Sequence, residues 1–297
     1  MEGIKQKKKF FRHDEKVAYT MLAIPLLWWC IFFLYAFLRA VYFSFTDLSV
    51  DISQISQFNL NNYIRLVKDA TFWKAMGNTL LWTAVMTIFN NIFGLFVAFL
   101  ITRLKKGQKI FLTLLFWPTL ASAVTSADIT KLIFSPSDSG IMNSIIQFFG
   151  GNSLAWYNDE KLSLFSLMLI PALFGFSTQM VIYYVAIKGV DKGMVEAAQI
   201  DGATPVQILL KIYIPSIMPA ITYNLIISII GGIKVIAPMQ LVSNGGPLDS
   251  SMSIMLYMYQ NTTVDMGYAC SIGIITLLII MGITMIQLKL TKKEGRI

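Results

Sequence analysis

The chain has 297 residues, of which 56% are hydrophobic and only 13% are charged, and its mean hydropathy is +0.63. Soluble domains carry about 25% charged residues, so this composition excludes an ordinary soluble protein and indicates a polytopic membrane protein. The single histidine, His13, and two isolated cysteines, Cys30 and Cys270, supply neither a metal-ligand cluster nor a disulfide framework. We therefore expect no metal site and no catalytic centre.

The N-terminus carries a basic tail, residues 1–16, which is followed by an apolar run over about 17–43. That run is too long for the apolar region of a signal peptide, and no small-residue cleavage pattern follows it. We expect it to be retained as a first membrane span.

Six apolar runs along the chain reach the roughly 20 residues that a membrane-spanning helix needs. None shows the alternation of a membrane β-barrel, and helices satisfy their own backbone hydrogen bonds in lipid. The prediction is an all-α membrane protein, a six-span transmembrane helical bundle with residues 17–297 as one domain. The predicted spans are about 17–43, 77–102, 110–134, 163–187, 216–243 and 267–289.

The Lys and Arg residues are distributed unevenly between the two sets of loops. Of 24, 17 fall in 1–16, 103–109, 188–211 and 289–297, and four fall in 44–76, 135–162 and 244–266. Cytoplasmic loops are the basic ones, so we expect a multi-pass protein of a prokaryotic cytoplasmic membrane with both termini cytoplasmic. The net charge of +8 is then a topology signal, and we expect no nucleic-acid partner.

Three tryptophans lie near run ends or in loops predicted to face outward: Trp73, Trp117 and Trp156. Such positions are typical of interfacial anchors. We expect all three to lie at the membrane–water boundary.

The segment over about 188–215 is polar and rich in helix-ending residues, although it lies between two apolar runs. Gly202 can end a short helix with a positive φ, and Pro205 suits the first turn of a second helix. The small side chains of Ala197, Ala198 and Ala203 permit close approach of another surface. The pattern predicts two short cytoplasmic helices, which are either a plain connection or a docking element.

The same segment, EAAQIDGATPVQILLKIYIP, resembles the signature of the membrane permease subunits of binding-protein-dependent ABC importers. The matching residues are Glu196, Ala197, Ala198, Asp201, Gly202, Ile212 and Pro215, while Ile214 stands where leucine is usual. Further stretches resemble the carbohydrate-uptake, maltose-type branch: PLLWW…SFTD, LFWPTLASAV, SNGGP and GYACSIG. So do the pairs Asn62–Tyr63 and Asn78–Thr79. In that branch Phe-Asp often follows the lysine that Lys234 matches, but Ile236 and Ala237 stand there in this chain.

The resemblance implies a non-catalytic translocation subunit that works with other chains. The implied partners are a second permease, two ATP-binding subunits that grip the segment around Gly202, an extracellular solute-binding protein, and membrane lipid. No glycine is followed by lysine, so this chain has no phosphate-binding loop. ATP and Mg²⁺ are therefore expected on the partner subunits, and no cofactor on this chain.

Small and polar residues in the fourth and fifth runs are candidates for contact with the solute. They are Gly175, Thr178, Ser228, Gly231, Gly232 and Lys234, with Gln179 and Asn224 also in these runs. Glycines of this kind either line a cavity or permit close helix packing. Lys234 is costly in lipid and has Asp128 as a possible partner, but Asp128 and Lys131 are equally placed to satisfy each other.

Two other classes of protein compete with this interpretation. An ion-coupled secondary transporter usually has several intramembrane carboxylates and an internal repeat, whereas only Asp128 lies well inside a run. A membrane-embedded enzyme needs a nucleophile with a base, or a metal cluster. An ABC permease for a solute other than a sugar is the nearest alternative.

Overall fold

Helices of very different length follow one another in the computed structural model, which describes residues 2–49 and 58–293. No strand is present among these residues, apart from a single antiparallel bridge between Thr46 and Phe58. In the following list η marks a short 3-10 or π-helical segment. The elements are α1 (Glu2–Trp29), η1 (Cys30–Leu34), α2 (Tyr35–Ser44), α3 (Asn61–Lys68), α4 (Ala70–Arg103), α5 (Gln108–Phe116), η3 (Trp117–Leu120), α6 (Ala123–Ile133), α7 (Ile141–Phe148), η4 (Trp156–Asn158), α8 (Ser163–Lys188), α9 (Lys192–Ile200), α10 (Pro205–Ile208), η5 (Leu209–Tyr213), α11 (Ile214–Ser216), α12 (Met218–Ile233), η6 (Met239–Ser243), α13 (Ile254–Asn261) and α14 (Met266–Lys293).

The chain divides into two compact units. Unit 1 comprises Met1–Val67 and Asn261–Ile274, and unit 2 comprises Lys68–Gln260 and Ile275–Ile297. Four helices are long and apolar enough to cross a membrane: Glu15–Ser44, Ala70–Arg103, Ser163–Lys188 and Met266–Lys289. They correspond to the first, second, fourth and sixth predicted spans.

The third predicted span, 110–134, is wrong as one straight helix. The helical stretches Gln108–Leu120 and Ala123–Ile133 meet at 88°. Pro118 lies in the first turn of η3, and Ser122 begins α6 by accepting a hydrogen bond from the Thr125 N–H at 3.1 Å. A side-chain cap of this kind starts a new helix in a new direction.

The fifth predicted span, 216–243, is also wrong as one continuous helix. Its long α-helix is Met218–Ile233, and this helix meets the preceding Pro205–Ser216 stretch at 76°. Ile217 has non-helical dihedrals, and Pro219 lies in the first turn of α12. The helix ends at Lys234, after two adjacent glycines, and η6 begins beyond Pro238. Prolines favour helix starts and glycines weaken helix interiors.

In unit 1, polar side chains form hydrogen bonds to backbone carbonyl groups and to one another. The Asn62 amide donates to the carbonyl oxygens of Ser44 and Thr46 at 3.2 and 2.8 Å. The hydroxyl groups of Tyr63 and Ser44 lie 2.7 Å apart. A Cβ atom on Gly267 would clash with the carbonyl oxygen of Thr46. The Asn62–Tyr63 pair and the glycine of GYACSIG therefore have a structural role in joining the chain's first and last spans.

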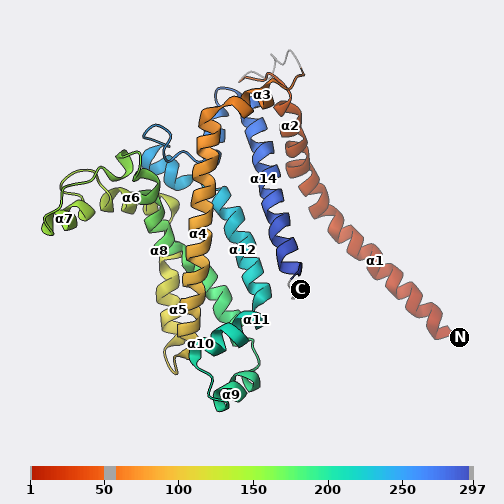
Figure 1. Cartoon of the computed structure of the whole chain (residues 1–297). Helices are drawn as coiled ribbons and strands as arrows, with labels where there is room; N and C mark the ends of the chain where they lie inside the picture. The colour runs from red at the N-terminus through yellow and green to blue at the C-terminus, as the bar shows by residue number, and fades with distance from the viewer. Residues whose placement is uncertain (1, 50–57, 294–297) are drawn as a thin grey trace. The chain divides into compact units, whose positions relative to one another are not determined.

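Unit 2 is built on α4, α8 and α12, which lie side by side (Figure 1). Their backbones approach closely where a glycine meets a polar side chain: Gly94 lies against Gln179, and Gly175 lies against Asn90. Short helices occupy the two ends of this group, with α9 and α10 at one end and α6 and α7 at the other (Figure 1).

The three tryptophans differ in their surroundings. Trp73 and Trp117 are exposed on the described surface, as anchors would be. Trp156 is only 8% exposed, its indole N–H donates to the Asn143 side-chain oxygen at 2.7 Å, and its ring packs on Phe134. The interfacial prediction for Trp156 is therefore wrong, because its polar edge is satisfied inside the protein.

Candidate functional site

The helix α9 carries the first part of the signature and begins at a side-chain cap. The Asp191 carboxylate accepts a hydrogen bond from the Gly193 N–H at 2.9 Å. Glu196 and Ala197 are exposed on α9, and Ala198 is half-buried. Glu196 lines a small cleft of about 220 Å³ together with Lys188 and Lys192.

The helix α9 ends in a Schellman motif centred on Gly202. The Ala203 N–H bonds to the Ala198 carbonyl at 2.9 Å, and the Gly202 N–H bonds to the Gln199 carbonyl at 3.1 Å. Gly202 has φ +80°, and nothing lies within 4 Å of the position that a Cβ would occupy. The glycine is thus required by the backbone and not by crowding, as the sequence predicted.

The helix α10 begins two residues later with a capping box. The Thr204 hydroxyl accepts from the Gln207 N–H at 3.3 Å, and the Gln207 side chain accepts from the Thr204 N–H at 2.7 Å. Pro205 lies in the first turn, as predicted. Three consecutive local motifs therefore fix the corner between α9 and α10. They are the Schellman motif, the capping box and the proline in the first turn of α10.

Beyond α10 the helix widens into the π-helical segment η5. The Ile214 N–H bonds to the Leu209 carbonyl, five residues back. Pro215 has no N–H, and in an α-helix its ring would meet the carbonyl of Lys211. The wider turn accommodates this proline, and Ile212 and Pro215 of the signature are both half-buried there.

Large apolar side chains of this segment point away from the rest of the protein. Ile200 is 86% exposed, Val206 61% and Met194 52%. Exposed apolar groups on a polar connection are typical of a protein–protein contact surface. The arrangement is thus a rigid, two-helix corner that presents apolar groups outward.

A second group of interest is a polar cluster between α4, α8 and α12. The Ser228 hydroxyl accepts from the Asn91 amide at 3.0 Å and from the Gln179 amide at 3.1 Å. The Tyr183 hydroxyl donates to the Asn91 side-chain oxygen at 2.6 Å. All three helices therefore meet through side-chain hydrogen bonds inside a largely apolar bundle.

The same polar cluster holds buried groups that have no hydrogen-bond partner among the described residues. They are the Thr87 hydroxyl and the side-chain oxygens of Asn90 and Gln179. Buried polar atoms are normally satisfied. Unsatisfied ones in a transport protein favour a place where water, a solute or a second arrangement of the helices supplies the missing bonds.

The residues predicted to contact the solute fall into two groups. Ser228, Gly175 and Gly232 face neighbouring helices, and a Cβ on Gly232 would lie 2.9 Å from Thr83. Thr178, Gly231 and Lys234 are exposed. Among the described residues, no ion pair joins Lys234, Asp128 and Lys131.

The sequence reasoning missed the contribution of α4 to this cluster. Thr87, Asn90 and Asn91 lie at positions i, i+3 and i+4 and thus on one helix face. This polar triplet lies inside the apolar second run, and it is the sequence feature from which the contribution of α4 could have been predicted. Tyr183 was also missed, because an aromatic residue in an apolar run carries no sign of a polar contact.

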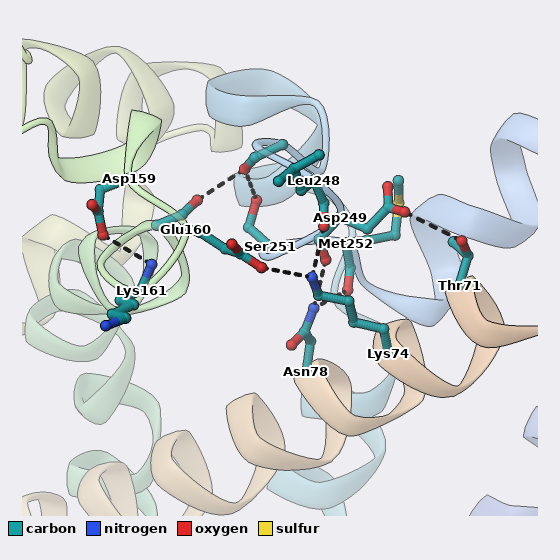
Figure 2. Close-up of polar contacts among 12 residues, drawn as sticks. Thr71, Lys74, Asn78, Asp159, Glu160, Lys161, Leu248, Asp249, Ser251 and Met252 are labelled. Carbon is teal, nitrogen blue, oxygen red and sulfur yellow. Dashed lines mark hydrogen bonds and ion pairs between the residues drawn. The ribbon is translucent and has the colours of Figure 1, made fainter.

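The ends of α4 and α8 are tied by a rim cluster, defined here as Thr71, Lys74, Asn78, Glu160 and Asp249 (Figure 2). Lys74 pairs with Glu160 at 3.0 Å and donates to the Leu248 carbonyl at 2.7 Å. Asn78 donates to the carbonyls of Asp249 and Met252 at 3.0 and 3.1 Å. The loop that follows η6 is therefore fastened to the start of α4.

The amino-acid sequence of this chain matches a known protein family. Residues 9–294 match the family model described as "Binding-protein-dependent transport system inner membrane component". The arabinooligosaccharides transport system permease protein AraP of Bacillus subtilis (strain 168) is 30% identical over 297 residues, with 97% of this chain and 93% of that protein covered. The multiple sugar-binding transport system permease protein MsmF of Streptococcus mutans serotype c is 26% identical, with 93% and 95% covered.

A solved structure shares the fold over almost the whole chain. It is the crystal structure of a bacterial ABC transporter involved in the import of the acidic polysaccharide alginate. The TM-score is 0.81 at 21% sequence identity, with 95% of this chain and 96% of that chain covered. At this identity the likeness concerns the fold alone.

Proposed function

The chain belongs to the family of binding-protein-dependent transport system inner membrane components, and from that premise we propose that it carries a sugar or an oligosaccharide as the permease subunit of an ABC importer. It is a multi-pass protein of the inner membrane with a translocating role. In the proposed topology each bent helix pair counts as one span, which gives six spans with both termini in the cytoplasm.

The observation that carries the proposal is the exposed corner between α9 and α10. Its backbone is fixed by the Schellman motif at Gly202 and the capping box at Thr204, while Ile200 and Met194 remain exposed. A rigid corner that presents apolar groups suits docking into a groove of another protein. We assign that groove to an ATP-binding subunit, with Glu196, Ala197, Ala198 and Asp201 on the docking surface.

Energy comes from partner chains in this proposal. The sequence has no phosphate-binding loop, so ATP and Mg²⁺ belong to two ATP-binding subunits. A second permease subunit completes the pathway, and an extracellular solute-binding protein delivers the solute. Closure of the ATP-binding subunits would move the α9–α10 corner and, through α12, rock the spans.

The sugar assignment draws support from two sources. The names of the relatives refer to arabinooligosaccharides and to multiple sugars. In addition, neutral amide and hydroxyl groups dominate the polar cluster of α4, α8 and α12. Such groups suit the hydroxyl groups of a carbohydrate, whereas an ionic solute would need a compensating charge. Solute contact is assigned to Ser228 with the exposed Thr178 and Gly231.

The test is a comparison of Gly202→Val with a matched glycine variant, Gly193→Ala, in the tagged full chain expressed in its native membrane. A β-branched residue at φ +80° destabilises the corner between α9 and α10 by at least about 1–2 kcal/mol. We expect Gly202→Val to lower the co-purifying ATP-binding subunit and the uptake of labelled oligosaccharide about tenfold.

Gly193 lies in the first turn of α9 without a positive φ, so Gly193→Ala should retain the partner and the uptake. A wild-type chain that purifies without any ATP-binding subunit would refute the importer assignment. A chain that retains this subunit but takes up only non-sugar solutes would refute the sugar assignment alone.

A further inference from the structure

An apolar groove of about 610 Å³ runs between α4 and α8 on unit 2. Leu81, Val85 and Phe89 line it on α4, and Leu164, Met168 and Leu173 line it on α8. One end is polar and carries Asn78, Glu160, Lys161 and Ser250. The groove is therefore amphipathic along its length, with an apolar body and one polar mouth.

The groove is elongated and open at the surface. Asn78 and Phe89 are 11 residues apart on α4, which corresponds to about 16 Å. An extended acyl chain can therefore lie along the groove, between the apolar side chains of α4 and α8.

The polar mouth contains two groups that are unused within the protein. Ser250 is only 6% exposed and lines the groove, and its hydroxyl has no hydrogen-bond partner among the described residues. Lys161 is exposed, and its ammonium group forms no ion pair among the described residues, while the nearby Asp159 carboxylate accepts a hydrogen bond from the Lys161 backbone N–H at 2.9 Å (Figure 2). The neighbouring Glu160 is already paired with Lys74 at 3.0 Å. The mouth therefore offers one buried hydroxyl and one ammonium group that forms no ion pair among the described residues.

We propose that this groove binds one glycerophospholipid. The phosphate lies on the Lys161 ammonium group, an ester carbonyl accepts a hydrogen bond from the Ser250 hydroxyl, and the acyl chains lie along α4 and α8. A membrane lipid matches both the apolar body of the groove and the exposed ammonium group at its mouth. The site depends only on the membrane location of the chain, and in the proposed orientation it lies in the outer leaflet.

The test uses the tagged full chain with its co-purifying partners, reconstituted in nanodiscs of phosphatidylethanolamine and phosphatidylglycerol and then extracted in mild detergent. Native mass spectrometry counts the lipids that remain bound. We expect one retained lipid per chain, a loss of about fivefold in Lys161→Ala, and a full loss in Ala172→Phe, which fills the groove. Lys131→Ala, an exposed lysine on α6 outside the groove, should retain the lipid.

Equal lipid retention in all four proteins would overturn the proposal. Lys161 is on the surface, so its variant keeps the test valid even if Ala172→Phe does not fold. A photo-crosslinking residue at Val85 provides an independent readout. An adduct of lipid mass supports the proposal, whereas an adduct with a second polypeptide chain shows that a protein segment fills the groove and overturns it.

Discussion

The two adjacent glycines of α12 show how strongly neighbouring residues can differ in their surroundings. A Cβ on Gly232 would lie 2.9 Å from the Cα of Thr83, whereas nothing lies within 4 Å of the same position on Gly231. Both residues are α-helical. Gly232 thus permits α12 to contact α4 closely, while Gly231 faces away from the other helices.

Substituting each glycine with alanine should separate these two roles. Gly232→Ala forces two packed backbones apart, and we expect a loss of about 1–3 kcal/mol of stability. Gly231→Ala adds a methyl group in open space and should gain up to about 1 kcal/mol from helix propensity. Thermal unfolding of the two purified variants in the same detergent measures the difference. Equal melting temperatures would contradict the close contact with Thr83.

The sequence could identify these glycines but could not distinguish them. Period and composition show that Gly231 and Gly232 lie in an apolar helix, and both cavity lining and helix packing were open interpretations. Which one faces α4 depends on the rotation of α12 about its axis. That rotation is set by contacts with residues far away in the sequence, such as the hydrogen bonds of Ser228 with Gln179 and Asn91, which lie 49 and 137 positions away. The role of Gly202 could be predicted from the sequence, because it depends only on the conformation of the local backbone.

At the scale of elements, short-range signals were reliable where a cap fixes a helix end. The helix α9 ends just before Gly202 and α10 begins at Pro205, as the sequence predicted. The runs 110–134 and 216–243 were predicted as single spans, because hydropathy does not register the direction of a helix. The Ser122 cap and the Pro219 helix start divide them, and each signal is a single residue inside an apolar run.

The capping box is the element that should respond most directly to a mutation. Thr204→Ala removes the acceptor for the Gln207 N–H, and a lost N-cap costs about 1 kcal/mol. We expect the amides at the start of α10 to exchange with deuterium about fivefold faster. Thr204→Ser keeps the hydroxyl and should exchange as the wild type does. Mass spectrometry of peptides covering α10 provides the measurement, and unchanged exchange in Thr204→Ala would exclude the cap as the stabilising contact.

At the scale of the whole molecule, the distribution of charge carries the topology. The predicted cytoplasmic segments hold 17 of the 24 Lys and Arg residues. The segment 103–109, between α4 and α5, belongs to this basic set, whereas the loop that contains α7 belongs to the other. From the positive-inside rule we predict that the first lies in the cytoplasm and the second outside.

Cysteine labelling in intact cells tests that topology. In a chain that carries Cys30→Ser and Cys270→Ser, we expect a membrane-impermeant maleimide to label Ser139→Cys. Lys106→Cys should react only after the membrane is permeabilised, because it lies in the basic set. Both positions are exposed in the structure, so burial does not limit the reaction. Labelling of Lys106→Cys alone in intact cells would reverse the orientation and, with it, the assignment of the α9–α10 corner to the cytoplasm.

The π-helical turn at Leu209–Tyr213 also bears on how genes of this kind can diverge in length. Its hydrogen bonds span five residues instead of four, so it holds one residue more than an α-helical turn requires. Deleting one codon there would shorten the turn to an α-helical one and leave the flanking residues in register. The same deletion elsewhere in a helix would rotate all later side chains by about 100°. Because Pro215 favours the longer form, such a deletion should be tolerated only in a chain that also replaces Pro215 with a residue that has a backbone N–H.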